Sequence, residues 1–206
     1  MPNYVYVAAV DDNKISIFAL DSQTGGLTLK DTVSVPGGPS PLAISPNRQV
    51  LYCSHREVPG ISSYLIDQFT GGLTQNGGVS TPDAPGFIAT DRSGKYLLAA
   101  YYQGGRVGVH PIGDDGAIGE PPTEWLDTEV GAHAIQTDRS NRFAFVPHIA
   151  RLQDDVTQPP KDAPGPNVIY QFRFDENTGR LTPNTPLKLE MNGFLGPRHY
   201  AFHPTQ

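Results

Sequence analysis

One short pattern recurs along the chain and limits the possible folds more than any other feature. The chain carries "DSQTGGLT" from Asp21, "DQFTGGLT" from Asp67, a degenerate "DDGAIG" from Asp114 and "DENTGRLT" from Asp175. The successive spacings are 46, 47 and 61 residues. Aspartate, asparagine and glycine at such positions are typical of hairpin turns, because they supply local hydrogen bonds and positive φ angles. A recurring period of this length indicates a repeat architecture.

A second repeated element lies half a repeat away from the first. It reads "SPNRQVLY" from Ser45, "DRSGKYLL" from Asp91, "DRSNRFAF" from Asp138 and "HPTQ" from His203, with spacings of 46, 47 and 65 residues. Both series lengthen in the fourth unit, which contains the stretch rich in Pro and Asp at 151–167. We interpret this stretch as a loop insertion within one repeat.

Between the turn elements, each unit contains four short β-like runs, for example "PLAIS", "VLYCS" and "SSYLI". The chain holds 22 Gly and 20 Pro, and no segment keeps an apolar helical period, so we expect an all-β fold. Four strands in a unit of roughly 45 residues are typical of a β-propeller blade.

The predicted fold is therefore a single β-propeller domain over 1–206. The predicted blade repeats lie near 4–38, 39–83, 84–131 and 132–195, and a fifth starts at 196–206. Propellers close on themselves with typically 4 to 8 blades. We therefore expect these four and a half blades to be part of a longer ring, with unpaired strand edges through which copies of the chain could self-associate.

The composition excludes several classes of function. The formal net charge is −6 and no Lys/Arg cluster occurs, which argues against nucleic-acid binding. No apolar run reaches the roughly 18 to 20 residues of a membrane span, and the first residues lack the pattern of a signal peptide. The single cysteine, Cys53, excludes an internal disulfide framework and agrees with a reducing compartment. We expect a cytoplasmic protein that binds neither membranes nor nucleic acid.

The candidate catalytic residues follow from the register of the repeats. One residue in each repeat is expected to start the innermost strand and to line the mouth of the central channel: Ser40, Gly86, His133 and Arg198. Two of these carry ionisable groups where the other repeats have small residues. We predict that His133, Arg198 and the adjacent His199 are the catalytic residues.

A second set of positions follows the second strand of each blade and is expected to border the same mouth. We predict substrate-binding roles for these residues: His55, Arg56, Tyr101 and His148. Structural roles are expected for His110, His203 and Trp125.

Nucleophilic and metal-dependent chemistry find little support. The chain has no G-x-S-x-G or H-E-x-x-H motif, and Cys53 lies in an apolar strand pattern. We predict neither a metal nor a cofactor. Several histidines meeting at the mouth leave a zinc site as an alternative, without a local spacing signature.

The stretch "GPRHYAFHP", the "GAH" that opens the fourth repeat and the repeated "SPN" and "TGGL" frame together resemble the seven-bladed lactonase family. This family includes the propeller-type 6-phosphogluconolactonases and the fungal carboxymuconate-lactonising enzymes. The resemblance runs from Tyr4 to the last residue. It implies a ring of seven blades with His133, Arg198 and Arg56 at the family's cleft, and an acidic residue in the fifth blade beyond Gln206.

The resemblance also implies a function. We expect a lactonase acting on a small anionic sugar lactone such as 6-phosphogluconolactone. Arg198 and Arg56 would hold the anion and stabilise the oxyanion, while His133 or the carboxylate beyond the chain activates water. We expect this chain alone to be at least about tenfold slower than a complete ring.

Two alternatives stay open at this point. A carboxymuconate-lactonising enzyme would share the mouth but run the reaction toward ring formation. A non-catalytic propeller would bind a partner at the mouth, and an aromatic patch there would favour it. Only Tyr101 and Tyr102 offer such a patch.

Overall fold

The computed structural model describes residues 2–149, 166–191 and 196–203. The described residues form fifteen strands and no α-helix. The first seven strands are β1 (Asn3–Ala9), β2 (Lys14–Leu20), β3 (Leu27–Ser34), β4 (Pro39–Ile44), β5 (Val50–His55), β6 (Gly60–Ile66) and β7 (Leu73–Ser80). The others are β8 (Phe87–Thr90), β9 (Tyr96–Tyr101), β10 (Arg106–Pro111), β11 (Glu124–Asp127), β12 (Gln136–Thr137), β13 (Phe143–His148), β14 (Val168–Asp175) and β15 (Arg180–Glu190). The all-β prediction is confirmed.

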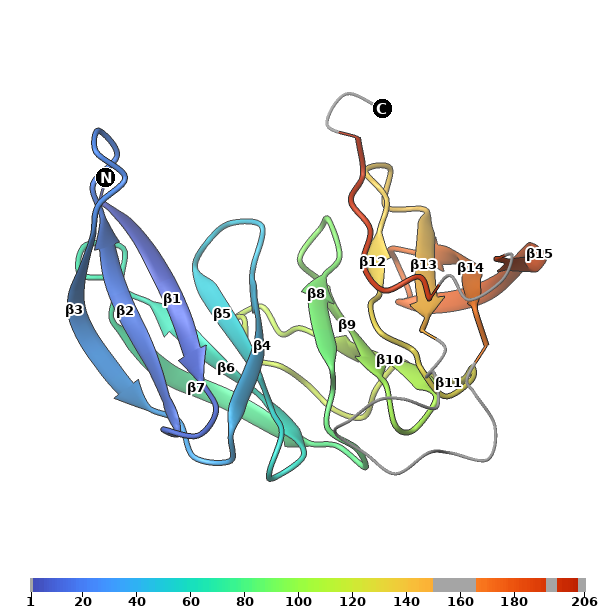
Figure 1. The fold of residues 1–206 in the computed structure, drawn as a ribbon, viewed down its shortest axis with the longest axis horizontal. Coiled ribbons are helices and arrows are strands. Elements are labelled where there is room, and N and C mark those ends of the chain that lie inside the picture. Colours follow the sequence, from blue (N-terminus) through green and yellow to red (C-terminus); the bar gives the residue numbers. More distant parts are fainter. Residues whose placement is uncertain (1, 150–165, 192–195, 204–206) are drawn as a thin grey trace.

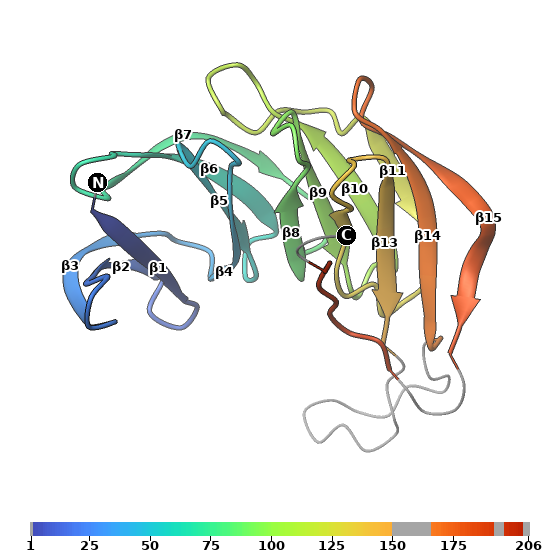
Figure 2. The same cartoon turned by 90° about the horizontal axis from the view of Figure 1, so that it is seen from above.

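The strands form four antiparallel sheets in which each strand pairs with its neighbours in the chain. The first sheet is β1-β2-β3, and the other three have four strands each: β4 to β7, β8 to β11 and β12 to β15. Figures 1 and 2 show the sheets following one another along an arc. The first strands of successive sheets lie next to each other, since β4 contacts both β1 and β8. This is the arrangement of propeller blades, as predicted.

Two predicted segments differ from the expectation or lie outside the described residues. Residues 196–203, predicted to start a fifth blade, contain no strand, because no described strand pairs with them. The predicted loop insertion at 151–167 lies almost entirely outside the described residues. The described part of the chain contains no helix that could span a membrane.

The core consists of three apolar layers, each between two successive sheets. Leu51 packs between the first and second sheets, and its neighbour Tyr52 packs between the second and third. In the same way, Leu97 faces the second sheet and Leu98 faces the fourth. Because alternate side chains point to opposite faces, strands buried on both faces read as continuous apolar runs. All residues of β5 and β9 are buried.

The "TGGL" elements form the hairpin turns that the sequence predicted. Asp67 Oδ1 accepts hydrogen bonds from the backbone N–H groups of Phe69 (2.9 Å) and Thr70 (2.8 Å). These bonds lower the pKa of Asp67 because they favour the carboxylate. The glycine that follows, Gly71, has a φ of +75°. The equivalent glycines Gly25 and Gly179 have φ angles of +73° and +71°.

Tyrosines of one sheet hold the hairpin turn of the next sheet. Tyr4 in β1 donates to Phe69 O (2.5 Å), and Tyr96 in β9 donates to Asn177 O (3.0 Å). At the same turns, a Cβ on Gly71 would lie 2.6 Å from the Tyr4 ring, and one on Gly179 would lie 2.5 Å from the Tyr96 ring. Glycine is therefore required there for two reasons, the positive φ and the close approach of the tyrosine.

The turn of the first sheet provides the comparison, because a Cβ on Gly25 would meet nothing within 4 Å. We expect Gly25→Ala to destabilise the protein by about 1–2 kcal/mol through its positive φ alone. Gly179→Ala has the same φ cost and adds overpacking against Tyr96, worth about 1–3 kcal/mol more. Urea unfolding of both variants measures the difference. Equal destabilisation would show that the tyrosine contact contributes nothing.

Candidate functional site

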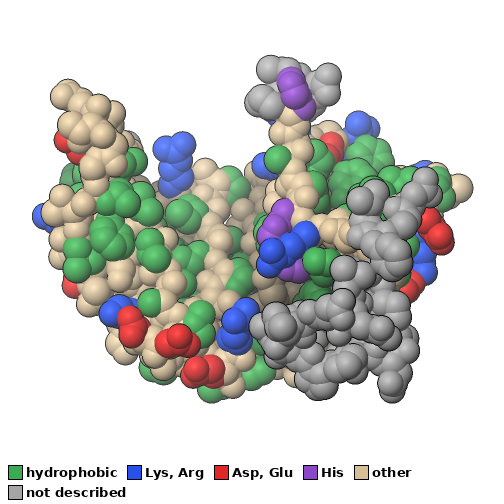
Figure 3. Space-filling view, viewed as in Figure 1, with side chains coloured by type: hydrophobic (Ala, Val, Ile, Leu, Met, Phe, Trp, Pro, Cys, Tyr) green, Lys and Arg blue, Asp and Glu red, His purple; other side chains and the backbone are tan. Residues whose placement is uncertain are grey.

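Side chains from two distant segments meet at one end of the sheets. Arg198 Nε donates a hydrogen bond of 3.0 Å to His133 Nε2, across 65 residues of sequence. The rings of His133 and His199 stand perpendicular, with centroids 4.7 Å apart. We call His133, Arg198, His199 and Tyr102 the His133 cluster. Figure 3 shows histidine side chains gathered with a Lys or Arg side chain on the face over the C-terminal segment.

Sheet pairing holds the backbone of His133 in place. The N–H of His133 donates to Pro147 O (3.0 Å), and Ala132 forms a β-bridge with His148 at the end of β13. Gly131, with a φ of +104°, allows the chain to approach Ile149, because a Cβ there would lie 2.7 Å from the Ile149 carbonyl oxygen. His133 therefore projects from a fixed position at the start of the fourth sheet.

The C-terminal segment is anchored two residues after Arg198. The Tyr200 hydroxyl accepts the N–H of Gln136 (2.8 Å) and lies 2.7 Å from Phe145 O. The rings of Phe145 and Phe202 pack around Tyr200. This anchor places the segment against β12 and β13, which brings Arg198 and His199 to His133.

Tyr102 completes the cluster and was absent from the predicted site residues. Its ring stands edge-on to His133, with centroids 5.8 Å apart. Tyr102 follows β9 directly and occupies the repeat position that holds Arg56 in the second sheet. That shared position, one residue beyond Tyr101, was the signal that could have identified it.

His133 is a neutral imidazole in this environment. Burial lowers its pKa most, and the neighbouring Arg198 and His199 lower it as well, to about 4 in all. Because the guanidinium N–H can only donate, Nε2 of His133 is the acceptor and the imidazole proton lies on Nδ1. No described residue accepts a hydrogen bond from that buried Nδ1. Arg198 itself is exposed.

The structure does not bring His55, Tyr101 or His148 to the mouth, although each lies at the predicted end of its strand. All three are buried and bonded within the protein. His55 Nε2 lies 2.7 Å from Ser62 Oγ, the Tyr101 hydroxyl lies 3.2 Å from His110 Nε2, and His148 Nε2 lies 3.0 Å from Thr128 Oγ1.

The physical reason for this correction is strand alternation. Tyr101 and His148 have no exposed surface and point into the layers between sheets. Tyr102, the residue after Tyr101, points the other way, toward His133. The prediction chose the right strand ends and the wrong face for these side chains. His55 is 8% exposed and lines a separate cavity of about 300 Å³ beside Pro36 and Val58.

Of the remaining predicted residues, two are exposed and two lie inside the sheets. Arg56 is exposed after β5, where its N–H donates to Gly38 O (2.9 Å). His110 is buried in β10, and Trp125 in β11 packs against Tyr101 with ring centroids 4.7 Å apart, so both have the expected structural role. His203 is exposed in the C-terminal segment.

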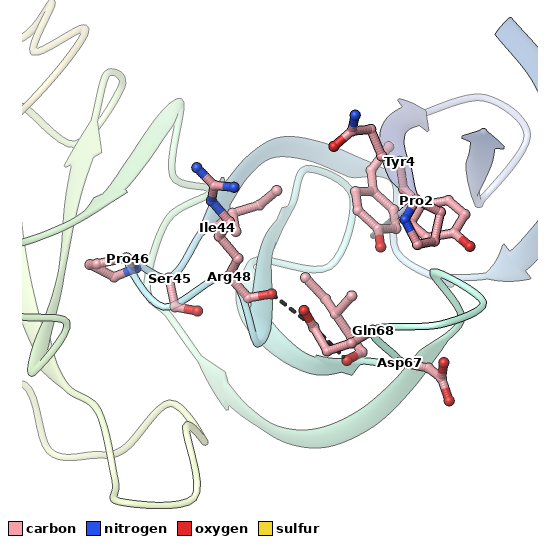
Figure 4. Close-up of a pocket in the computed structure, with 11 residues that line it drawn as sticks. Pro2, Tyr4, Ile44, Ser45, Pro46, Arg48, Asp67 and Gln68 are labelled. Carbon is pink, nitrogen blue, oxygen red and sulfur yellow. Dashed lines mark hydrogen bonds between the residues drawn. The ribbon is translucent and has the colours of Figure 1, made fainter. Parts of the chain in front are cut away.

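A larger cavity of about 520 Å³ lies between the first two sheets, at the opposite ends of the strands (Figure 4). Two of its polar side chains are bonded within the protein. The Gln68 amide donates to Arg48 O (3.0 Å), and Tyr6 donates to Gly71 O (2.9 Å). We therefore assign these groups to the fold. Among the described residues, no group of three or more His, Cys, Asp or Glu side chains is placed to hold a metal ion.

Comparison with known proteins identifies the family. The family described as "Lactonase, 7-bladed beta-propeller" matches residues 4–206. The chain belongs to this seven-bladed propeller lactonase family. The resemblance predicted from the sequence is thereby confirmed, and the four sheets are blades of that fold.

Curated relatives align along the whole chain. A 6-phosphogluconolactonase of Pectobacterium carotovorum is 36% identical over 206 residues, covering 100% of this chain and 56% of the relative. One of Yersinia pestis is 37% identical over 204 residues, covering 99% of this chain and 55% of the relative. The chain thus spans about half the length of the curated relatives it matches.

Solved structures support the same fold. The periplasmic gluconolactonase of Pseudomonas aeruginosa superposes with a TM-score of 0.81 at 20% identity, covering 100% of this chain and 60% of that one. A candidate 6-phosphogluconolactonase of Bacteroides fragilis gives a TM-score of 0.80 at 20% identity, covering 99% and 58%. At this identity the likeness shows the propeller fold.

The burial of His148 predicts an effect of pH on stability. Burial lowers the pKa of His148 to about 4, from an ordinary value of 6.5. Between these two values the unfolded chain binds a proton that the folded protein does not, so the free energy of unfolding falls as pH decreases from 6.5 toward 4. We expect His148→Gln to reduce this slope in urea unfolding between pH 7 and 5. His203→Gln, at an exposed position, is the control, and an unchanged slope in His148→Gln would contradict the prediction.

Proposed function

We propose that this chain carries the catalytic face of a lactone hydrolase that acts on a small anionic sugar lactone of the 6-phosphogluconolactone type. The observation that carries the proposal is the contact of an exposed, permanently charged guanidinium, Arg198, with the neutral imidazole of His133. The curated relatives named 6-phosphogluconolactonase support the substrate class. Because the chain spans about half of those relatives, the activity of the whole protein is part of the proposal.

Lactone hydrolysis needs a base for water and a cation for the developing oxyanion. His133 is neutral near pH 7 and can accept a proton from water. The water oxygen then bonds to the lactone carbonyl carbon, and the carbonyl oxygen becomes an oxyanion. When the ring C–O bond breaks, the imidazolium returns its proton to the ring oxygen, and the product is the open hydroxy acid. General bases of this kind contribute typically about 10²- to 10⁴-fold.

Arg198 and Arg56 are the residues proposed to contact the negatively charged groups of the substrate. Arg198 and Arg56 are both exposed, Arg56 directly after β5 and Arg198 at His133, before the fourth sheet. Guanidinium groups bind phosphate and carboxylate oxygens through two parallel hydrogen bonds. We propose that they hold the substrate's anionic group and stabilise the oxyanion.

His199 has a different proposed role from the catalytic one expected from the sequence. Its ring stands between His133 and Phe87, 4.7 Å and 6.2 Å from their ring centroids. The contact with His133 is edge-on and the contact with Phe87 is tilted, so His199 packs against the His133 imidazole from one side. We propose that His199 positions His133.

The alternatives receive less support. The relatives named 6-phosphogluconolactonase favour hydrolysis over a lactonising reaction. For a binding platform, the aromatic patch expected at the mouth loses Tyr101, which is fully buried.

We also propose a cytoplasmic location, which the free buried thiol of Cys53 supports.

Two substitutions test the catalytic assignment. We expect His133→Asn to lower kcat for 6-phosphogluconolactone at least about hundredfold, because the base is lost. Arg198→Gln should lower kcat/KM more for this substrate than for uncharged gluconolactone. Both rates are measured after subtraction of spontaneous hydrolysis.

Arg139→Gln is the matched control, because Arg139 is an exposed arginine in the turn at the other end of the sheet. It should leave both rates unchanged. A His133→Asn protein with normal kcat would remove the proposed base. A wild-type chain that neither hydrolyses any lactone nor binds 6-phosphogluconate would overturn the proposed function.

A further inference from the structure

The geometry of the His133 cluster presents a conflict. A general base needs a free lone pair, and in neutral His133 that lone pair lies on Nε2. In the structure Nε2 already accepts the Arg198 Nε–H at 3.0 Å. The other ring nitrogen is buried and carries the proton. His133 therefore cannot take a proton from water while Arg198 remains bonded to it.

From this contact we infer that the anionic group of the substrate unmasks His133 by drawing the Arg198 guanidinium away from Nε2. The inference rests on the proposed function and deepens it. The anion would be more than a binding handle, because its arrival creates the base that the reaction needs.

Arg198 gains a stronger hydrogen bond when it leaves His133 for an anion. The bond between Arg198 and His133 joins a cation to a neutral acceptor, whereas a bond to phosphate or carboxylate joins opposite charges and is shorter and stronger. The Arg198 side chain is exposed, so it can move to an incoming anion without opening the core. His133 is held by its backbone bond to Pro147 and by the rings of His199 and Tyr102, so it stays in place.

The charges around His133 also favour activation of the base when an anion binds. Among the residues that the structure describes, the groups that face His133 are Arg198 and His199 of the C-terminal segment and Tyr102 after β9. Burial lowers the pKa of His133 most, and the electrostatic effects of Arg198 and His199 both lower it as well. An anion that neutralises Arg198 removes one of them and raises the pKa. A base whose pKa approaches the working pH is more effective.

The enzyme should therefore discriminate between lactones with and without an anionic group. A sugar lactone without an anionic group does not draw Arg198 away from His133. The lone pair on Nε2 then stays bonded to the guanidinium and cannot take a proton from water. The anion is therefore expected to raise kcat as well as to lower KM. An ordinary binding handle would improve binding of substrate and transition state equally and leave kcat unchanged.

Histidine NMR tests the inference without turnover. The protein is labelled with ¹⁵N-histidine, and His133 is titrated with pH, first alone and then saturated with 6-phosphogluconate, the hydrolysis product. In the free protein we expect a neutral ring with the proton on Nδ1 and a pKa well below 6.5. With the ligand, the Nε2 resonance should shift to that of a free lone pair, and the pKa should rise toward 6.5.

Arg198→Gln provides the second arm, because it removes the charged donor. In this variant the pKa of His133 should be raised without ligand and should respond little to it. The resonances of buried His148 are the internal control for global change. Inorganic phosphate, used as a second probe, should reproduce the shift at higher concentration.

The outcomes separate the two proposals. If 6-phosphogluconate binds and the His133 resonances and pKa stay unchanged, the unmasking is wrong, whereas the lactonase proposal stands on its own rates. If the pKa rises and no lactone is hydrolysed, the unmasking stands and the proposed function fails. If Arg198→Gln keeps the wild-type pKa, or no anion shifts any resonance of the cluster, the inference is overturned.

Discussion

The structure depends on one constraint, which is that a small sheet with two apolar faces cannot bury both of them by itself. β9 is buried on both sides, with Leu97 facing one neighbour and Leu98 the other. Each sheet therefore needs a sheet on either side, and the stack continues along the chain. The tyrosine and glycine contacts at the hairpin turns, such as Tyr96 on Gly179, hold each neighbour at a set distance. Face-to-face packing thus determines the arc on which the blades lie.

The same packing assembles the site. Because the first strands of successive sheets lie together, the loops at their ends meet from parts of the sequence that are far apart. His133 enters this meeting point from the start of the fourth sheet, and Tyr102 enters from the end of β9. The C-terminal segment reaches it because Tyr200 is bonded to the edge of the fourth sheet. The core supplies rigidity, and the chemistry lies at the ends of strands, where side chains reach solvent.

The chemistry of the site depends on surroundings more than on residue type. His148 and His133 are both neutral histidines whose pKa is lowered to about 4. His148 is enclosed, since its Nδ1–H donates to Val146 O and its Nε2 accepts a hydrogen bond from Thr128 Oγ1. His133 instead has an exposed arginine on its one acceptor nitrogen. A histidine bonded to the core is a structural residue, whereas one bonded to an exchangeable partner can be controlled by a ligand.

The sequence by itself determined the parts of this protein that rest on local interactions. The turn at Asp67 and Gly71 could be read directly, because its hydrogen bonds and positive φ involve residues within a few positions of each other. The repeat period then predicted the blades and assigned His133 and Arg198 to equivalent repeat positions at the mouth. Only the tertiary structure decided which face each strand end presents. Tyr101 turned inward and Tyr102 outward because the twist and packing of neighbouring sheets set the register, and a shift of one residue reverses every side chain. The bond between Arg198 and His133 was equally out of reach of the sequence, since it joins segments 65 residues apart whose distance is set only when the sheets pack.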